Sequence, residues 1–350
     1  MKTIWLLSAY RSDSHASWAD GLVRHQIEFA WRVFELPGRQ FAWRIRSNPL
    51  SWMKEFSKAL AQQRPDLILA SSMVDLATIK GLHPRLANVP CLYYFHENQL
   101  AYPIIPGQVQ SIEPVMVQLY GALAADRVLF NSHYNRNSFL DGLRALAKRL
   151  PDGIPPRLAD ELATRSEVLP VAVEAIEPGT RSTPDLILWN HRWEHDKQPD
   201  QFKDAMIELD RSSRSFELAL LGPRIQKTPP SLQALVDHFG ERVRINGFIA
   251  RTDYEHWLGR ASIVVSTAIH EFQGLSLLEA VSAGARPVVP DALCYREQYP
   301  SSCLYSPEAP GDLLRRLHET LDAPEIAAPD VSDYLSPTVQ PEWTELLQSL

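Results

Sequence analysis

Short apolar runs alternate with longer stretches of helical periodicity along most of the chain. The run Leu67–Ala70 is continuously apolar and follows Arg64-Pro65-Asp66, so it predicts a strand covered on both faces. Two stretches of the first half have helical spacing, Trp18–Phe34 and Trp52–Gln63. The strands that the pattern predicts in this half are Ile4–Ser8, Phe41–Ile45, Leu67–Ala70, Cys91–Phe95 and Arg127–Phe130. Alternation of this kind indicates βαβ units around a parallel sheet.

The pattern is interrupted once, near the middle of the chain. Pro151-Asp152-Gly153-Ile154-Pro155-Pro156 and the polar stretch after it are typical of a domain boundary. The rhythm then resumes, with predicted strands at Asp185–Trp189, Glu217–Leu221, Val243–Asn246, Ile263–Ser266 and Pro287–Val289. We therefore expect an α/β protein of two Rossmann-like domains, residues 1–166 and 167–335, facing one another across a ligand-binding cleft. Residues 336–350 predict a final helix that packs back on the first domain.

Composition narrows the class of protein. The chain has 350 residues and 45% of them are hydrophobic, which suits two packed cores and excludes a largely disordered chain. No apolar run approaches the roughly 18–20 residues that span a bilayer. The apolar part of Met1–Tyr10 is too short for a signal peptide, and Arg11 and Asp13 follow at once, so we expect a buried strand there. Three cysteines without metal-ligand spacing favour a reducing, cytoplasmic location.

The formal net charge of −7 conceals a difference between the two halves of the chain. Residues 1–150 contain 17 basic and 11 acidic side chains, a net +6, whereas residues 151–350 contain 18 and 31, a net −13. A basic half can meet an anionic partner such as RNA although the whole protein is acidic. Such a split also arises by chance in two-domain enzymes, so it does not identify the partner.

The segment from His270 to Val289 carries the most informative chemistry. After a predicted strand and a loop, Gly274 and Ser276 open a helix, whose first N–H groups favour an anion such as a phosphate. Glu271 and Glu279 lie eight positions apart, one on the loop and the other two turns into the helix. Because a carboxylate accepts hydrogen bonds from vicinal hydroxyls, this set suits a sugar nucleotide. The plainer interpretation is a helix-start charge and one solvated helical glutamate.

A second segment, Leu186–Asp200, supplies cations. Arg192 and Lys197 follow a predicted strand and share one loop. Fixed cations stabilise the negative charge that develops on a leaving diphosphate. The alternative is a basic loop that is merely balanced by Glu194 and Asp196.

These two segments resemble the retaining glycosyltransferases of the GT-B fold, in the large family that carries a Glu-x7-Glu motif. The resemblance implies that Glu271 contacts the transferred sugar and that Arg192 and Lys197 grip the diphosphate. It further implies a set of residues around the nucleotide, with Glu279 on the ribose: Gly274, Leu275, Ser276, Glu279, Phe248 and Ile249. Gly222-Pro223-Arg224 follows another predicted strand and would also face the nucleotide, although a glycine after a strand is often only a turn.

Three denser motifs resemble one subgroup, the tRNA-queuosine mannosyltransferases. They are Trp189–Lys197, Phe95–Pro103 and Phe130–Asn135, and the resemblance extends from Ser8 to about Pro300. It implies transfer of mannose from GDP-mannose to the cyclopentenediol of queuosine in the tRNA-Asp anticodon. The partners it implies are a nucleotide sugar and a tRNA that contains queuosine. No metal or other cofactor is expected, because cationic side chains and backbone dipoles take the role of a metal ion.

In the first domain the resemblance points to residues at strand ends. His96 would lie over the donor sugar and β-phosphate, although a single histidine is often structural. The other residues expected to line the donor or acceptor site are Glu97, Asn98, Asn131, Ser132, Ser14 and His15. The stretch Ser8–His15 lacks the paired glycines of many relatives, and Asp13 beside a diphosphate would be unfavourable unless it points away.

The mechanism implied by the resemblance is transfer on one face of the sugar with retention of configuration, through an oxocarbenium-like transition state. Glu271, His96, Arg192 and Lys197 are then the catalytic candidates. One alternative is a hexosyltransferase of the same fold with a lipid or glycan acceptor. A membrane acceptor predicts an amphipathic basic stretch, and only scattered arginines and lysines occur, so we expect no stable membrane association. Another alternative is a non-catalytic protein that binds a sugar nucleotide or RNA. The sequence leaves the oligomeric state open.

Overall fold

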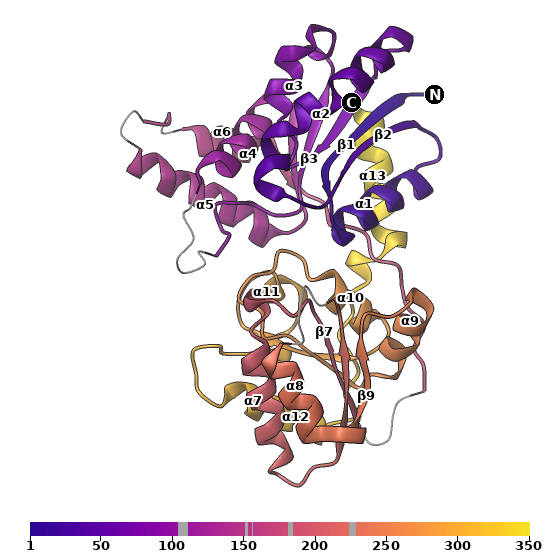
Figure 1. Cartoon of the computed structure of the whole chain (residues 1–350), viewed down its shortest axis with the longest axis vertical. Coiled ribbons are helices and arrows are strands. Elements are labelled where there is room, and N and C mark those ends of the chain that lie inside the picture. The colour runs from indigo at the N-terminus through magenta and orange to yellow at the C-terminus, as the bar shows by residue number, and fades with distance from the viewer. Residues whose placement is uncertain (104–110, 151–152, 156, 181–184, 224–228) are drawn as a thin grey trace. The chain divides into compact units, whose positions relative to one another are not determined.

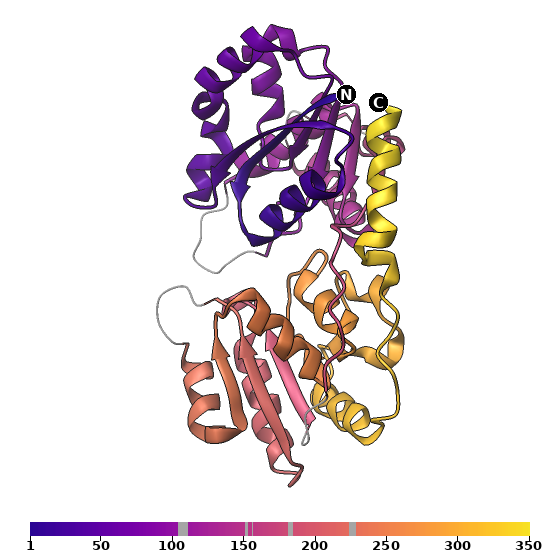
Figure 2. The same cartoon turned by 90° about the vertical axis from the view of Figure 1, so that its right-hand side faces the viewer.

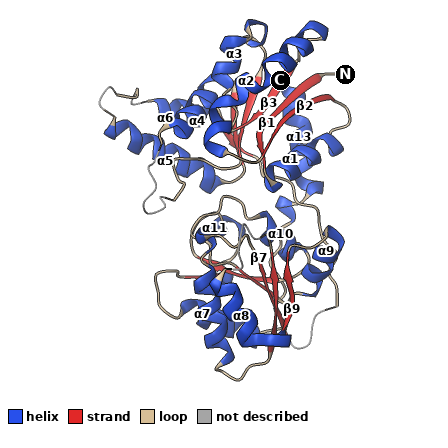
Figure 3. Cartoon of the chain, in the orientation of Figure 1, coloured by secondary structure: helices blue, strands red, loops and turns tan. Residues whose placement is uncertain are grey.

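A computed structural model describes residues 1–103, 111–150, 153–155, 157–180, 185–223 and 229–350. The chain divides into two compact units (Figure 1), unit 1 with residues Met1–Ala172 and Pro337–Leu350, and unit 2 with residues Val173–Ser336. Each unit contains a parallel sheet of six strands with helices around it (Figure 3). The predicted fold class, α/β with two Rossmann-like domains, is confirmed. None of the described helices is long and apolar enough to cross a membrane.

The sheet of unit 1 has the strand order β2-β1-β3-β4-β5-β6. Its strands are β1 (Thr3–Arg11), β2 (Ala30–Pro37), β3 (Leu67–Ser71), β4 (Cys91–Phe95), β5 (Arg127–Phe130) and β6 (Ser166–Val168). Every residue of β3 and β4 is buried, because helices cover both faces of the central strands. All strands are parallel, so the residues that follow β1, β4 and β5 lie at one edge of the sheet.

Seven helices are described in unit 1, together with a short 3₁₀ turn at Pro84–Leu86. They are α1 (Asp13–His25), α2 (Phe41–Gln62), α3 (Leu76–Leu82), α4 (Glu113–Ala124), α5 (His133–Arg149), α6 (Leu158–Thr164) and α13 (Ser336–Ser349).

The second strand and the second helix of unit 1 differ from the sequence prediction. The predicted strand Phe41–Ile45 is the start of helix α2, whose buried residues Ile45, Trp52 and Phe56 keep helical spacing. The predicted helix Trp18–Phe34 ends at His25, and its last part belongs to β2. As an edge strand β2 pairs only with β1 and is mostly half-buried, so it lacks the continuous apolar run of an inner strand.

Helix α13 returns to unit 1 (Figure 2), as expected for residues 336–350. The side chain of Gln26 donates to the carbonyl of Gln340 at 2.8 Å and accepts from the Thr344 hydroxyl at 2.7 Å. The Trp343 ring is 1% exposed and lies 5.4 Å from the ring of Tyr94 on β4. The last helix therefore packs directly against a strand of the unit 1 sheet.

The sheet of unit 2 has the order β12-β11-β10-β7-β8-β9. Its strands are β7 (Asp185–Asn190), β8 (Phe216–Leu221), β9 (Val243–Gly247), β10 (Ile263–Val265), β11 (Arg286–Pro290) and β12 (Leu304–Tyr305). Its helices are α7 (Pro199–Asp210), α8 (Pro230–Phe239), α9 (Arg251–Arg260), α10 (Leu275–Ser282), α11 (Tyr295–Gln298) and α12 (Asp312–Asp322). The 3₁₀ turns are His195–Lys197, Gly240–Arg242, Ser301–Cys303 and Ser332–Tyr334.

The boundary between the units lies at Ala172/Val173, whereas the sequence analysis placed it after residue 166. The stretch in which the boundary was predicted contains helix α6 and leads into strand β6, and both belong to unit 1. With these bounds unit 1 holds 19 basic and 17 acidic side chains, and unit 2 holds 16 and 25. The net charges are therefore +2 for unit 1 and −9 for unit 2. The difference shrinks because most of the charged side chains of α6, its neighbours and α13 are acidic.

Candidate active site

Two loops at the carboxyl ends of neighbouring strands build the polar site of unit 2. The first follows β7 and ends in the 3₁₀ turn His195–Lys197, and the second joins β10 to α10. Strands β7 and β10 pair in parallel, so both loops start at the same edge of the sheet. The amide of Ile269 donates to the carbonyl of Asp196 at 2.9 Å, which joins the loops directly.

Lys197 lies at the centre of this site and is 6% exposed. Its Nζ donates to the carbonyl of His270 at 2.7 Å and to Glu271 Oε2 at 3.2 Å, and it lies 3.2 Å from Asp196 Oδ2. Burial by itself would lower the pKa of Lys197, but the two carboxylates outweigh it and the pKa is raised. The side chain is therefore a cation throughout the physiological pH range.

Glu271 is the main partner of Lys197, and its side chain is 22% exposed. Burial alone would raise the pKa of Glu271, but the charge of Lys197 outweighs it, and the pKa falls to about 2. Burial, followed by the charge of Lys197, lowers the pKa of the neighbouring His191 to about 3 and that of His270 to about 4. Near neutral pH the site thus contains a lysine cation, a glutamate anion and two uncharged histidines.

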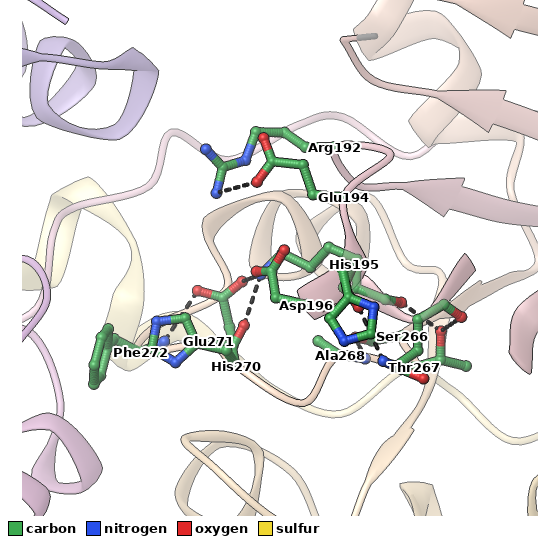
Figure 4. Close-up of polar contacts among 12 residues, drawn as sticks. Arg192, Glu194, His195, Asp196, Ser266, Thr267, Ala268, His270, Glu271 and Phe272 are labelled. Atoms are coloured by element: carbon green, nitrogen blue, oxygen red, sulfur yellow. Dashed lines mark hydrogen bonds and ion pairs between the residues drawn. The ribbon is translucent and has the colours of Figure 1, made fainter. Parts of the chain in front are cut away.

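Arg192 lies at the edge of the same loop, and its side chain is 50% exposed. Its Nη2 lies 3.6 Å from Glu194 Oε2, a loose pair compared with that of Lys197. Figure 4 draws the Arg192–Glu194 pair apart from the group around Glu271. An exposed arginine in a weak pair can reorient at little energetic cost, because surface ion pairs contribute about 0–1 kcal/mol.

Helix α10 begins beside Glu271, at Gly274. Gly274 has φ of +67°, and a Cβ there would lie 3.5 Å from Glu271 Cγ and 3.4 Å from Tyr295 Cε1. Glycine suits this left-handed turn, which lets the loop enter the helix directly. The first amides of a helix, here at Leu275 and Ser276, have no acceptor within the helix and favour an anion.

Glu279 lies a little more than one turn into α10, not two turns as the sequence suggested. Its carboxylate accepts from Arg251 Nη1 at 2.6 Å and from the Tyr254 hydroxyl at 2.9 Å. Asn190, the last residue of β7, donates to Tyr254 Oη at 3.2 Å and to the carbonyl of Ser276 at 2.7 Å. These contacts fix Glu279 at the start of the helix, with its side chain 18% exposed.

Phe248 and Ile249, the other predicted nucleotide contacts, follow β9. Phe248 is 76% exposed and Ile249 is half-buried. Gly222 follows β8 with φ of +120°, and a Cβ there would lie 2.1 Å from the carbonyl oxygen of His191. Gly222 therefore allows the turn after β8 to pack against the loop of Arg192. Arg224 lies outside the described residues.

In unit 1, His96 follows β4 and is 6% exposed. Its ring lies 4.0 Å from the ring of His15 and 4.8 Å from those of Trp18 and Tyr94. His96 Nε2 and His15 Nδ1 are buried and make no hydrogen bond within the described part of the chain. Burial lowers the pKa of His15 to about 4 and that of His96 well below its ordinary value, with the adjacent His15 adding to the second shift.

The predicted polar residues near His96 form a buried network. Asn131 donates to the carbonyl of His96 at 2.8 Å, and Asn98 donates to Asn135 Oδ1 at 2.8 Å. Ser132 caps helix α5 by accepting from the amide of Asn135 at 2.9 Å. Glu97 is half-buried and accepts from Gln99 at 3.3 Å. The amides of Asn98 and Asn131 thus hold the backbone after β4 in place.

The expected first loop is almost absent. Strand β1 runs to Arg11 and helix α1 begins at Asp13, so Ser12 alone joins them. Ser14 is exposed and His15 is buried on the first turn of α1. The side chain of Asp13 lies outside what the structure describes. Paired glycines are not needed for a loop, because the strand passes directly into the helix.

Residues 3–173 match the family described as tRNA-queuosine alpha-mannosyltransferase N-terminal, and residues 184–322 match the glycosyl transferases group 1. A tRNA-queuosine alpha-mannosyltransferase of Drosophila melanogaster is 30% identical over 316 residues, which cover 87% of this chain and 83% of the relative. The chain belongs to the tRNA-queuosine alpha-mannosyltransferase family.

Solved structures agree with the fold of this family member. The sucrose-phosphate synthase of Thermosynechococcus elongatus superimposes with a TM-score of 0.76 at 13% identity, covering 100% of this chain and 99% of that structure. HepE of Anabaena in complex with UDP superimposes with a TM-score of 0.69 at 15% identity, covering 100% of both chains. At such low identity the likeness concerns the GT-B glycosyltransferase fold alone.

Sequence reasoning missed three residues that shape the site of this glycosyltransferase. Asp196 counted only as a balancing charge, yet it contacts Lys197 directly. Arg251 and Tyr254 of α9 hold Glu279, although they lie 28 and 25 positions away from it. A lone arginine or tyrosine on a helix carries no sequence signal for such a contact. The described residues contain no group of three or more His, Cys, Asp or Glu that could hold a metal ion.

Proposed function

We propose that this protein transfers a mannosyl group from GDP-mannose to the cyclopentenediol of queuosine in the anticodon of tRNA-Asp, with retention of configuration. The observation that carries the proposal is the 30% identity, over 87% of the chain, to a relative named for this activity. The buried Lys197–Glu271 pair beside the start of α10 supports it, because that arrangement suits a nucleotide diphosphate joined to a sugar.

Donor binding is assigned to unit 2. The diphosphate binds the first amides of α10, near Leu275 and Ser276, together with Lys197 and Arg192. Arg192 leaves Glu194 to reach it, which is consistent with the 3.6 Å separation and the exposure of that pair. Glu279 accepts hydrogen bonds from the ribose hydroxyls, since each carboxylate oxygen can accept a further bond beside those from Arg251 and Tyr254.

The transfer step follows from the charges of the site. The bond from the anomeric carbon to the phosphate oxygen breaks, and a queuosine hydroxyl oxygen forms the new bond on the same face. The hydroxyl proton passes to the leaving phosphate. Lys197 and Arg192 stabilise the charge that the phosphate gains. With a pKa of about 2, Glu271 remains a carboxylate, so it orients sugar hydroxyls and stabilises positive charge at the anomeric carbon rather than donating a proton.

Unit 1 contributes His96 and receives the acceptor. A neutral imidazole with a buried Nε2 that lacks a partner among the described residues suits a sugar hydroxyl. The proposal includes no metal ion, since Lys197, Arg192 and the start of α10 neutralise the diphosphate. It assigns the reaction to the cytoplasm, in keeping with a tRNA acceptor and three cysteines without disulfides.

The test is an assay of the purified protein with queuosine-containing tRNA and a panel of labelled sugar nucleotides. We expect transfer from GDP-mannose and none to the same tRNA with guanine in place of queuosine. Arg192→Ala and Lys197→Ala should each lower turnover by about 10²–10³, as loss of one donor to a developing oxyanion does. Transfer only to lipid, or only from UDP-sugars, would overturn the proposal.

A further inference from the structure

The segments that carry Lys197 and Glu271 are joined by a buried threonine that the mechanism does not yet use. Thr267 lies between β10 and the loop of Glu271 and is 1% exposed. Its hydroxyl lies 2.7 Å from the carbonyl oxygen of Lys197 and 3.0 Å from that of Gln198. The Gln198 carbonyl also accepts from the amides of Gln201 at 3.0 Å and Phe202 at 3.3 Å. The single proton of the Thr267 hydroxyl therefore matters most to the Lys197 carbonyl. Figure 4 draws Thr267 on the strand side of the site.

The backbone that Thr267 holds is strained. Gln198 has φ of 49° and ψ of 54°, a left-handed conformation that residues other than glycine rarely adopt. Such a conformation persists only where the surroundings enforce it, and it is often found at functional sites. Pro199 begins helix α7 directly after it, so the chain must turn between Lys197 and the helix within one residue.

The same two segments are connected by further bonds on either side. The Ile269 amide donates to the Asp196 carbonyl at 2.9 Å, and Lys197 Nζ donates to the His270 carbonyl at 2.7 Å. Residues 196–198 and 267–271 therefore form one hydrogen-bonded unit, with Thr267 as its side-chain link. The Nζ of Lys197 can reach Glu271 only while the Lys197 backbone keeps this position relative to residues 267–271.

We propose that Thr267 is a positioning residue for the transfer reaction, which fixes the backbone of Lys197 and supports the left-handed turn at Gln198. The inference rests on the proposed role of Lys197 at the leaving diphosphate. Loss of the hydroxyl leaves the buried Lys197 carbonyl without its side-chain donor and removes one of the donors to the Gln198 carbonyl, which loosens the turn. Lys197 then meets the phosphate oxygens out of alignment, and misplacement of about 1 Å can lower a rate a hundredfold.

The test compares Thr267→Val, which keeps the shape and removes the hydroxyl, with Thr267→Ser, which keeps the hydroxyl. We expect Thr267→Val to lower kcat by about ten- to a hundredfold per folded molecule, with the KM for tRNA unchanged within about twofold. Thr267→Ser should retain kcat within about threefold. Thr320→Val is the matched control, because it removes a hydroxyl away from the site. The Thr320 hydroxyl donates to the Arg316 carbonyl within helix α12.

A double variant tests the support of the turn. Glycine adopts positive φ freely, so Gln198→Gly in the Thr267→Val background should recover part of the lost kcat. No recovery would overturn the assignment of Thr267 to the left-handed turn. A Thr267→Val enzyme with kcat within twofold of wild type, or a Thr267→Ser enzyme as slow as Thr267→Val, would overturn the positioning role.

A measurement without substrate separates this inference from the proposed function. Hydrogen exchange at the Ile269 amide should become faster in Thr267→Val and stay unchanged in Thr267→Ser and Thr320→Val. If wild-type protein transfers no sugar to queuosine tRNA, the proposed function fails while the exchange result still tests the link. If wild type is active and exchange at Ile269 does not change in Thr267→Val, the link itself is refuted.

Discussion

The buried pair of Lys197 and Glu271 makes the stability of unit 2 depend on pH in a defined way. The pKa of Glu271 is lowered to about 2, from an ordinary value of 4.5. A difference of about 2.5 pKa units corresponds to about 3.5 kcal/mol, at about 1.4 kcal/mol per unit. Because the folded-state pKa is depressed, this stabilisation is fully present above pH 4.5. It is lost as the pH falls from about 4.5 towards 2.

The informative perturbation is Lys197→Met, which keeps most of the apolar side chain and removes its charge. The carboxylates of Asp196 and Glu271 then lose the cation that they share, so burial raises the pKa of Glu271 above its ordinary range. The sign of the pH dependence therefore reverses. Between pH 5 and 7 the wild-type pair contributes the same stabilisation at every pH. In the variant, the free energy of unfolding of unit 2 should fall as the pH rises over this range. At pH 7 the loss should be about 3–5 kcal/mol, as expected for a broken buried pair.

The assay is hydrogen exchange in increasing denaturant, resolved by peptide, because a chain of two units need not unfold in one step. Peptides from β7 and β10 report on unit 2, and those from β3 and β4 serve as the internal reference. Lys203→Met is the matched control, since Lys203 contacts Asp200 and Asp204, whose side chains are 76% and 71% exposed. It should cost less than about 1 kcal/mol. Parallel pH curves for wild type and Lys197→Met between pH 5 and 7 would refute the reasoning.

Four further predictions each concern a single residue. Gly222 has φ of +120°, and a Cβ there would clash with the His191 carbonyl, so Gly222→Ala should lower the free energy of unfolding of unit 2 by about 2–4 kcal/mol. Gly21 lies in open space on α1, so Gly21→Ala should raise the free energy of unfolding of unit 1 by about 0.5–1 kcal/mol. Thermal melts measure both changes. Because the pKa of buried His15 falls from 6.5 to about 4, unit 1 should lose up to about 3 kcal/mol as the pH drops from 6.5 to 4, and His15→Phe should flatten that part of the curve measured by hydrogen exchange. Tyr254→Phe removes one of the hydrogen bonds to Glu279 and should raise the KM for the nucleotide sugar about fivefold, with kcat nearly unchanged. Steady-state kinetics in which kcat and KM change equally would contradict this prediction.

Buried central strands were the part of the fold that the sequence predicted best. Strands β4 and β5 have the predicted bounds, since strands covered on both faces are nearly continuous apolar runs. The edge strand β2 was missed for the opposite reason, because only one of its eight residues is fully buried and its pattern merges with the helix before it. The stretch predicted as the domain boundary contains helix α6 and leads into strand β6, and both belong to unit 1 through contacts with residues far away in the sequence.

For the site, the sequence by itself predicted which residues have side chains whose chemistry suits a sugar nucleotide. Glu271, Glu279, Arg192 and Lys197 stand out through their types, their spacing and their place after apolar strands. Only the tertiary structure decided how they are joined. Lys197 and Glu271 are 74 positions apart, and they meet because β7 and β10 are parallel neighbours whose following loops start at one edge of the sheet.

The direction of a side chain was likewise beyond the sequence. Asn98 follows β4 and Asn131 follows β5, yet their amides bond within unit 1, Asn98 to Asn135 and Asn131 to the carbonyl of His96. The spacing of apolar residues along the chain indicates which element a residue belongs to, because helices and strands repeat their buried positions with different periods. The charge state and the orientation of a side chain depend on which groups, distant in the sequence, the fold places in contact with it. That is why the pKa of Glu271, the strained turn at Gln198 and the link through Thr267 are properties of the folded protein alone.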